Sequence, residues 1–229
     1  MDTFKDLNSA FCESLAKLKR KGSNVSSRGS NQREMLFHNI CITDPTALTI
    51  APPIRKFKPT YAIAEWLWYL SRDRQVKNIG KFADVWNQIQ DAEGECESNY
   101  GTYLLGSQWE WVIDELMNAP DSRRATIAIN QPHHKGKNNA DYPCTQYIHF
   151  FIRDNRLHLG IHMRSNDAIF GFCNDVFTFC DAKTSDKEQT PQTVVGAHKM
   201  PDGKNLFSLS QDLSAFKYKV YNVDVNYTE

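Results

Sequence analysis

The stretch MRSNDAIFGFCNDVF, residues 163–177, decides how this chain is interpreted, because polar side chains interrupt a run that otherwise looks like protein core. It holds an Arg-Ser pair, the acid Asp167, the glycine Gly171 and an Asn-Asp pair at 174–175. Polar groups are costly to bury unless they are paired, so this pattern indicates a functional segment. For Asp175 two roles stay open: an ordinary helix N-cap before VFTF, or a group that recognises a ligand.

Around this stretch, hydrophobic spacing predicts helices mixed with strands. The predicted helices are 3–21, capped by Gly22, then 61–73, a shorter piece at 82–90, and a helix from 108 that ends near Pro120. The predicted strands are 39–53 (strand and turn), 125–130, a pair within 147–165 that turns at Asp154-Asn155, and part of the tail 206–227. Residues 23–37 are expected to be a polar loop entering a strand, and 181–205 a polar loop block. Without a regular βαβ rhythm, this order favours an α+β fold with a mixed sheet.

Bulk properties exclude several classes of protein. The 229 residues suit one domain, 1–229, and 27 basic residues balance 27 acidic ones. A net charge of zero disfavours direct nucleic-acid binding or attachment to an anionic membrane. The six cysteines show no C-x-x-C spacing, so we expect neither disulfides nor a metal site. The N-terminus lacks an apolar signal core and no run is long enough to span a membrane, so we expect a soluble, cytoplasmic protein, in the host cytoplasm if viral.

Two side chains are candidates for chemistry. Glu65 lies within the apolar helix YAIAEWLWYL, where it is either on the one wet face or a buried general acid with a raised pKa. Cys144, in DYPCTQ, is either a small core residue or a nucleophile. Arginines are available to hold an anion and to favour a thiolate, although most arginines are simply surface charges. They are Arg28, Arg123, Arg124 and Arg164.

Five separated segments, AEWLWYL, NYG, DSRR, YPCTQ and RSNDAIFGFCND, together resemble the motifs of the thymidylate synthase superfamily in order and spacing. The resemblance covers roughly residues 20–180 and is greatest to the phage branch of deoxycytidylate hydroxymethylases. It implies a thymidylate synthase-like fold, with a mixed β-sheet flanked by helices. It also implies a homodimer formed through a sheet face, and a site for a pyrimidine nucleotide monophosphate and 5,10-methylenetetrahydrofolate.

The resemblance assigns each matching residue a role. The implied catalytic residues are the nucleophile Cys144, the acid Glu65, the proton-transfer residue Tyr100 and the base-binding Asp175. The implied phosphate-binding residues are Arg28, Arg164 and Ser165, with Arg123 and Arg124 donated across the dimer. The implied folate-binding residues are Asp167, Gly171 and Trp86. Gly171 would let the backbone approach a ligand closely.

The chemistry of the family explains these residue types. A thiolate that adds to C6 of the pyrimidine makes C5 nucleophilic, and C5 then attacks the one-carbon unit of the folate. Loss of the C5 proton and of tetrahydrofolate leaves an exocyclic methylene. A synthase reduces this methylene with hydride from the folate to give a methyl group, whereas a hydroxymethylase adds water.

The position four residues after the motif glycine is asparagine in the synthases and Asp175 here. An ionised carboxylate only accepts hydrogen bonds, so it suits the amine of cytosine and not O4 of uracil. A one-residue shift would instead place Asn174 there and restore a preference for uracil. We therefore expect dCMP or CMP as substrate, and the sequence does not distinguish deoxyribose from ribose.

Several positions depart from the synthase pattern. Thr145 replaces the histidine after the nucleophile, His149 replaces a glutamine, and Ile89 replaces a second tryptophan near the folate. The block 181–205 replaces a long apolar helix, and the chain contains no His-x-Tyr motif to hold the sugar. Three hypotheses result: hydroxymethylation of a cytidine nucleotide, thymidylate synthesis from dUMP, or a catalytically silent nucleotide-binding homologue.

Overall fold

The computed structural model of the chain describes residues 1–27, 29–135, 140–154, 156–181 and 220–228. The α-helices are α1 (Leu7–Lys21), α2 (Pro59–Ser71), α3 (Val85–Ile89), α4 (Gly101–Leu104), α5 (Ser107–Asn118) and α6 (Phe172–Asp181). Three short 3₁₀ turns are η1 (Pro53–Arg55), η2 (Ile79–Lys81) and η3 (Pro132–His134). The strands are β1 (Asp2–Phe4), β2 (Ser23–Ser27), β3 (Ser30–Ile42), β4 (Thr126–Ala128), β5 (Thr145–Arg153), β6 (Arg156–Asp167) and β7 (Val220–Thr228).

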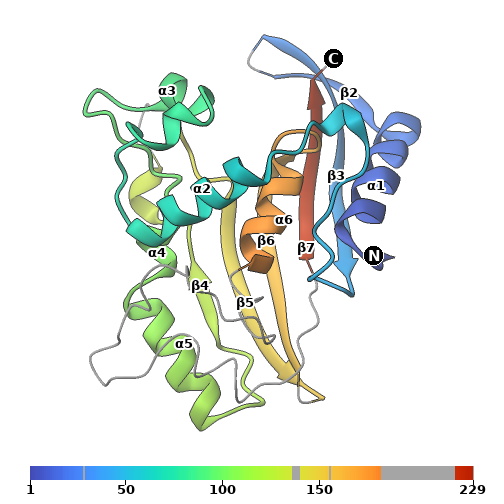
Figure 1. The fold of residues 1–229 in the computed structure, drawn as a ribbon. Helices are drawn as coiled ribbons and strands as arrows, with labels where there is room; N and C mark the ends of the chain where they lie inside the picture. The colour runs from blue at the N-terminus through green and yellow to red at the C-terminus, as the bar shows by residue number, and fades with distance from the viewer. Residues whose placement is uncertain (28, 136–139, 155, 182–219, 229) are drawn as a thin grey trace.

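All these strands form one seven-stranded sheet in the order β1-β3-β7-β6-β5-β4, with β2 paired to β3 (Figure 1). β1 is parallel to β3 and β6 is parallel to β7, whereas the remaining pairs are antiparallel. The predicted α+β fold with a mixed sheet is therefore confirmed.

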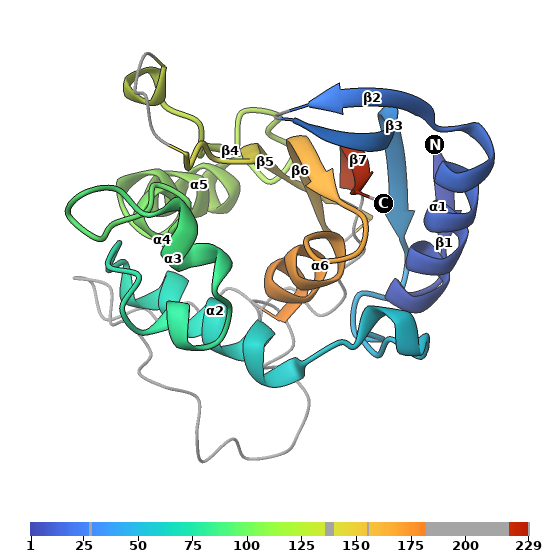
Figure 2. The same ribbon diagram turned by 90° about the horizontal axis from the view of Figure 1, so that it is seen from above.

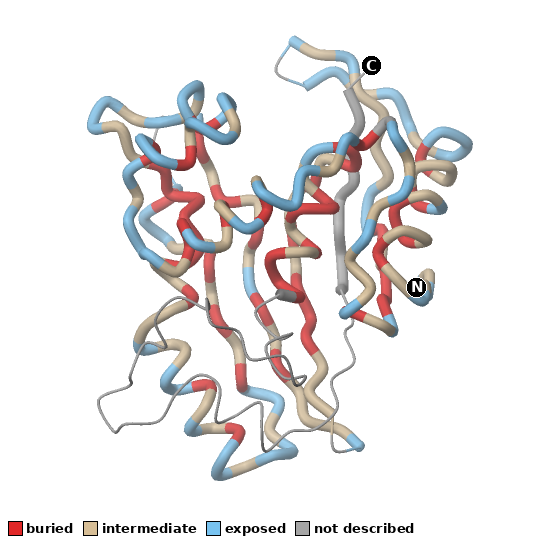
Figure 3. The backbone as a smooth tube through the Cα atoms, viewed as in Figure 1, coloured by how far each residue is buried: buried red, intermediate tan, exposed pale blue. Residues whose placement is uncertain are grey.

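The helices α2 and α6 lie over one side of the sheet, and α6 lies between the strands and α2 (Figure 2). Buried positions are frequent on α6 and in residues 96–101 (Figure 3). The buried apolar side chains form one cluster that joins α1, α2, the sheet and α6. On the opposite side of the sheet, Tyr147 of β5 is 37% exposed and its ring stacks on His162 of β6 at 4.8 Å. The carboxyl end of β6 and the first turn of α6 thus meet between the sheet and α2.

The predicted helix 3–21 begins later than expected, at Leu7, because Asp6 caps it. The carboxylate of Asp6 accepts the backbone N–H of Ser9 at 2.7 Å, and residues Asp2–Phe4 form the short strand β1 instead. The predicted C-cap at Gly22 is confirmed, since its N–H donates to the carbonyl of Leu18 at 2.8 Å. A Cβ at Gly22 would lie 2.5 Å from that oxygen, so close packing requires glycine there.

The expectation of a polar loop entering a strand at 23–37 was right about the strand, which is β3, and wrong about the loop, because Ser23–Ser27 form β2 and pair with β3 as a hairpin. Its strands carry serine, asparagine and charged residues in place of alternating apolar ones, so sequence periodicity did not reveal them. Backbone hydrogen bonds at the edge of an existing sheet hold the hairpin, and this pairing is a tertiary effect that sequence periodicity cannot report.

The two strands predicted within 147–165 are confirmed as β5 and β6, with Asp154 at φ 52° in their connection. The helices expected at 61–73, 82–90 and from 108 are α2, α3 and α5, although α3 is trimmed to five residues. The strand expected in the tail is β7, which pairs with both β3 and β6. Most of the polar block 181–205 lies outside the described residues.

Candidate active site

The thiol of Cys144 lies immediately before β5, next to an arginine of the neighbouring strand. The N–H of Arg164 donates to the carbonyl of Cys144 at 2.9 Å, and its guanidinium lies 3.7 Å from Sγ. The same guanidinium donates to the carbonyls of Pro143 and Tyr142 at 3.2 and 2.7 Å. Arg164 thereby braces the loop that carries Cys144, and its positive charge favours a thiolate at that sulfur. Ser165 follows Arg164 on β6 and is partly exposed.

Tyr100 is buried beneath this loop. Its hydroxyl oxygen accepts the backbone N–H groups of Cys144 and Thr145 at 3.3 and 3.4 Å. Burial and the nearby Cys144 raise the pKa of Tyr100 above its ordinary value, so the phenol stays protonated near neutral pH. The next residue must be glycine, since a Cβ at Gly101 would overlap the carbonyl oxygen of Tyr69 at 1.7 Å. The Tyr-Gly pair is thus explained by packing around the nucleophile loop.

Glu65 is buried on α2, with 5% of its surface exposed, so the wet-face interpretation of this residue was wrong. Its Oε1 accepts the hydroxyl of Tyr61 at 2.7 Å, and its Oε2 is buried without a hydrogen-bond partner among the described residues. Burial and the neighbouring Asp175 raise the pKa of Glu65 to about 8, against the lowering effects of Tyr61 and Arg55. Glu65 is therefore mostly protonated at neutral pH.

Asp175 lies in the first turn of α6, which begins three residues earlier at Phe172. Its Oδ2 accepts a hydrogen bond from the amide of Asn166 at 2.8 Å, and no backbone N–H of α6 donates to its carboxylate among the described contacts. The N-cap interpretation of Asp175 was therefore wrong. Burial raises the pKa of Asp175 to about 7, with Asn166 lowering it and the charge of Asp167 raising it.

Asn174, the alternative reader of the base, has its amide occupied by the protein. Its Oδ1 accepts from the guanidinium of Arg55 at 2.9 Å, and its Nδ2 donates to the carbonyl of Phe170 at 3.0 Å. Both Asn174 and Arg55 are buried, with 7% of each residue exposed. Both polar atoms of the Asn174 side chain are thus engaged by the protein, with one N–H and one lone pair of the amide left over.

Asp167 and Gly171 shape the turn between β6 and α6. Oδ1 of Asp167 accepts the backbone N–H groups of Ile169 and Phe170, which closes the turn. A Cβ at Gly171 would lie 2.7 Å from Oδ1 of Asn166, so a side chain at this position would push the Asn166 amide aside. Phe170, at the tip of this turn, is 71% exposed.

Trp86, the predicted folate contact, is buried beside Glu65. Its indole packs against Trp68 at 4.9 Å between ring centres, and its N–H donates to the hydroxyl of Tyr61 at 3.1 Å. Trp86 therefore belongs to the surroundings of the Glu65 carboxyl.

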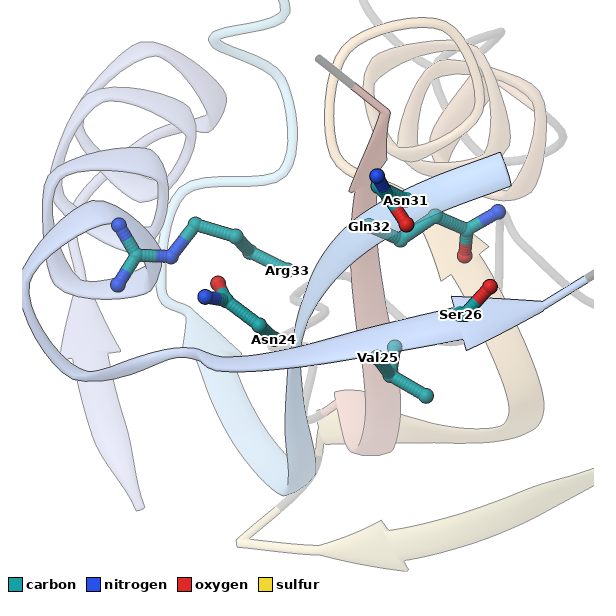
Figure 4. Close-up of a pocket in the computed structure, with 6 residues that line it drawn as sticks. All are labelled: Asn24, Val25, Ser26, Asn31, Gln32 and Arg33. Carbon is teal, nitrogen blue, oxygen red and sulfur yellow. The ribbon is translucent and has the colours of Figure 1, made fainter. Parts of the chain in front are cut away.

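The remaining candidate arginines are Arg28, Arg123 and Arg124, and the structure does not bring the last two to this group. Arg28 lies outside the described residues, although the hairpin on either side of it forms a hollow (Figure 4). Arg123 and Arg124 are exposed after α5, and Arg124 forms a two-pronged pair with Glu115 at 3.0 and 3.1 Å. The hollow of Figure 4 is lined by Asn24, Val25, Ser26, Asn31, Gln32 and Arg33, and contains none of the residues around Cys144.

Three buried or partly buried residues at the site were missed by sequence reasoning. Tyr61 lies four residues before Glu65, a helical spacing that could have indicated the contact. Asn166 lies within the stretch 163–177, but its contact with Asp175 depends on the fold. Arg55 carries no sequence signal, because a buried arginine resembles a surface one in sequence.

Glu97, His133 and His134 offer potential metal-binding atoms within 4.8 Å of one another. The backbone N–H of Gln131 donates to Nδ1 of His134 at 3.0 Å, which places the proton of the neutral ring on Nε2. That Nε2 lies 2.8 Å from the hydroxyl of Tyr103, which in turn lies 2.7 Å from Oε2 of Glu97. In this tautomer Nε2 has no lone pair for a metal, so the cluster is a hydrogen-bond network.

The fold and the site define an α+β protein that gathers a thiol, a guanidinium, one buried carboxyl and one partly buried carboxyl at one side of a mixed sheet. The chain belongs to the thymidylate synthase family, whose model, described as "Thymidylate synthase", matches residues 9–180. No helix among the described residues is both long and apolar enough to cross a membrane.

Individual relatives are similar over part of their length. The deoxycytidylate 5-hydroxymethyltransferase of Enterobacteria phage T4 is 35% identical over 124 residues, which cover 50% of each chain. The deoxyuridylate hydroxymethyltransferase of Bacillus phage SP01 is 27% identical over 177 residues, covering 70% of this chain and 46% of that one. The chain thus spans about half the length of the curated relatives it matches.

Among solved structures, the thermostable thymidylate synthase A from Bacillus subtilis is similar with a TM-score of 0.71. The match covers 98% of this chain and 80% of that chain, at 16% identity. At this identity the likeness shows the fold, which confirms the thymidylate synthase-like architecture expected from the motifs.

Proposed function

We propose that the protein is a folate-dependent 5-hydroxymethyltransferase that acts on a cytidine nucleotide. The reaction is dCMP plus 5,10-methylenetetrahydrofolate plus water, giving 5-hydroxymethyl-dCMP and tetrahydrofolate. The observation that carries the proposal is the difference in hydrogen bonding between the side chains of Asn174 and Asp175. The amide of Asn174 is occupied by Arg55 and Phe170, whereas Asp175 is held by a single hydrogen bond to Oδ2.

The carboxylate of Asp175 reads the base in this proposal. Its Oδ1 accepts no hydrogen bond from the described residues and can accept one from the exocyclic amine of cytosine. Above the pKa of Asp175, about 7, uracil would present O4 to the same oxygen of the ionised carboxylate, which leaves two acceptors facing one another. A site built for one hydrogen-bond pattern rejects the other by several kcal/mol, or roughly a hundredfold or more. The T4 relative is named for the same base, and the SP01 relative is named for uracil.

Cys144 is the nucleophile that adds to C6, and Arg164 has two tasks. Its guanidinium, 3.7 Å from Sγ, favours the thiolate, and it can bind the nucleotide phosphate together with Ser165. The phosphate contact would position C6 above the sulfur, and positioning of this kind is worth about 7–11 kcal/mol in favourable cases. Arg28 and, from a second subunit, Arg123 and Arg124 complete the phosphate site in this proposal.

Glu65 and Tyr100 handle protons. A carboxyl with a pKa of about 8 is protonated at neutral pH and can give a proton to the pyrimidine ring as the thiolate adds. Tyr100, whose hydroxyl lies against the backbone of Cys144, assists removal of the proton from C5.

The folate co-substrate supplies the one-carbon unit. The residues present fit such a ring system, because exposed Phe170 adjoins Asp167, whose Oδ2 accepts no hydrogen bond from the described residues. That oxygen can accept from a pterin N–H group. Gly171 and Trp86 complete the folate-binding set carried over from the family.

The open side of the sheet is the proposed surface for a homodimer. Tyr147 and His162 stack there, and Tyr147 is 37% exposed. A dimer would also bring Arg123 and Arg124 of one subunit to the phosphate of the other. Sedimentation equilibrium tests this, and a monomer at micromolar concentration would contradict it.

A single assay tests the function. The full chain is incubated with methylenetetrahydrofolate and C5-tritiated dCMP, CMP or dUMP, and tritium release is measured with Cys144→Ser as the blank. We expect release from dCMP, 5-hydroxymethyl-dCMP as product, and no dihydrofolate. Release from CMP would instead identify the ribonucleotide as the substrate. Release only from dUMP would overturn the base assignment, and no release from any nucleotide by the folded protein would favour a silent nucleotide-binding homologue.

A further inference from the structure

A directional chain of hydrogen bonds ends on the Glu65 carboxyl. The indole N–H of Trp86 donates to the hydroxyl oxygen of Tyr61 at 3.1 Å, and that hydroxyl donates to Oε1 of Glu65 at 2.7 Å. An indole nitrogen is only a donor, so Tyr61 must be the acceptor of this first bond. Its single hydrogen is then directed to Glu65, and the chain runs one way.

Helix geometry and ring packing hold the hydrogen-bonded residues Trp86, Tyr61 and Glu65 in place. Tyr61 and Glu65 are four residues apart on α2 and therefore lie on the same face of the helix. Trp86 comes from α3 and is anchored by its packing on Trp68, also of α2, at 4.9 Å. Trp86 and Trp68 are buried, with 8% and 7% exposed, so neither ring can turn away without disrupting the core.

We propose that Tyr61 is a positioning residue that fixes which oxygen of Glu65 exchanges a proton. Oε1 is kept as an acceptor by Tyr61, so the proton of the neutral acid resides on Oε2. Oε2 is the buried oxygen that lacks a partner among the described residues, and such an atom is costly unless a ligand satisfies it. This inference rests on the proposed role of Glu65 as the acid that protonates the pyrimidine.

The other charged groups around Glu65 set the direction of its response to pH. Asp175 on α6 raises the pKa of Glu65, and Arg55, in the segment before α2, lowers it. The bond from Tyr61 also lowers the pKa, because it stabilises the ionised carboxylate. The phenol groups of Tyr69 and Tyr100 have raised pKa values and remain neutral. Removing the hydroxyl of Tyr61 should therefore raise the pKa of Glu65.

A second tyrosine–glutamate pair in the same chain supplies a matched control. The hydroxyl of Tyr103 donates to Oε2 of Glu97 at 2.7 Å, the same length as the bond from Tyr61 to Glu65. Glu97 also accepts from Arg74 at 3.0 Å. The replacements Tyr61→Phe and Tyr103→Phe thus remove the same group and the same kind of bond, but only the first lies in the proposed active site.

The test measures kcat against pH for the full chain and both variants. If Glu65 acts as a protonated acid, kcat falls as pH rises through its pKa. We expect Tyr61→Phe to move this alkaline limb upward by about half a pH unit to one unit and to lower kcat about tenfold. KM for the nucleotide should change little, and Tyr103→Phe should keep the wild-type profile even if its melting temperature falls. An unchanged profile for Tyr61→Phe, or equal shifts in both variants, would overturn the proposal.

A second measurement does not depend on turnover. Titration of isotope-labelled glutamate side chains by NMR, with the Glu65 signal assigned from Glu65→Gln, reports the pKa of Glu65 directly. We expect that pKa to rise in Tyr61→Phe and to stay in place in Tyr103→Phe. If the protein turns over none of the nucleotides, the proposed function fails while this titration still tests the link between Tyr61 and Glu65. No change of the pKa in Tyr61→Phe would remove that link.

Discussion

Two pairs of buried or partly buried carboxyls in this molecule differ in how many hydrogen bonds their oxygens accept from the protein. Glu97 accepts from Tyr103 and Arg74, and Asp141 accepts from Ser98 through both oxygens, from its hydroxyl and from its N–H. In the other pair, Glu65 and Asp175, one oxygen of each carboxyl accepts a hydrogen bond from the protein. The second oxygen accepts none from the described residues.

The difference indicates which carboxyls the fold uses for its own stability. Burial raises the pKa of Asp141 as well as those of Glu65 and Asp175, so a raised pKa alone does not separate the two pairs. What separates them is hydrogen-bond saturation. A buried acceptor without a donor destabilises the folded state, and such groups gather where a ligand completes the bonding.

The largest effect should come from removing the proton of Glu65. We expect Glu65→Gln to lower kcat about 10²–10⁴-fold, because an amide cannot act as an acid, while the protein stays folded. Glu97→Gln should do the opposite. It removes the partner of the Arg74 charge at 3.0 Å and should destabilise the protein by about 3 kcal/mol with little change in kcat per folded molecule. Tritium release measures the loss of kcat expected for Glu65→Gln, and urea unfolding measures the loss of stability expected for Glu97→Gln.

The second effect concerns the choice of base. Asp175→Asn should shift the ratio of kcat/KM for dCMP over dUMP by about a hundredfold toward dUMP, since an amide can donate to O4 of uracil. Asp141→Asn, made in the saturated pair, should weaken stability and leave the ratio unchanged. A constant ratio in Asp175→Asn would mean that the base is read by another residue.

The third effect is a dependence of stability on pH. Folding raises the pKa of Glu65 from 4.5 to about 8 and that of Asp175 from 3.8 to about 7, so the folded state binds more protons than the unfolded state between those values. The free energy of unfolding should therefore be highest below about pH 4 as far as these two groups are concerned, and should fall as pH rises to about 8.

Glu65→Gln isolates this contribution. The variant should lose about 3 kcal/mol less stability than wild type between pH 5 and pH 8, measured by urea unfolding at each pH. Equal slopes in the two proteins would mean that Glu65 is ionised in the folded state at neutral pH.

Sequence patterns predicted the elements whose signal is local. The spacing of apolar residues located α2 and α5, and Gly22 marked the end of α1. The β2–β3 hairpin was missed because its polar strands are stabilised by pairing at a sheet edge, which leaves no hydrophobic period in the sequence.

The candidate site shows the same division. The sequence motifs located Cys144 and Glu65. They could not show how many donors reach each carboxyl oxygen, because that number depends on residues far along the chain. Asn174 and Asp175 illustrate this, since adjacent residues in one helical turn point to Arg55 and Asn166 respectively. Only the fold decides which of the two keeps an open oxygen.

The smallest effect tests whether the hydrogen bond from Asn166 is needed to orient the Asp175 carboxylate and keep its Oδ1 free for the base. Asn166 donates to Oδ2 of Asp175 at 2.8 Å, and a Cβ added at Gly171 would lie 2.7 Å from its Oδ1, too close to leave the Asn166 amide in place. The other close atoms around that Cβ are the backbone oxygen and nitrogen of Asp167, at 3.2 and 3.3 Å, which cannot shift without opening the turn.

Gly171→Ala should therefore displace the amide of Asn166 and release Asp175. We expect the preference for dCMP over dUMP to fall about three- to tenfold, which is the net value of one hydrogen bond, with a loss of stability of about 1–2 kcal/mol. Gly106→Ala is the control, because its added Cβ would meet nothing closer than 3.7 Å and its φ of 179° suits any residue. If Gly171→Ala lost stability but kept its base preference, Asp175 would hold its orientation without Asn166, and the open oxygen would be a property of the helix turn alone.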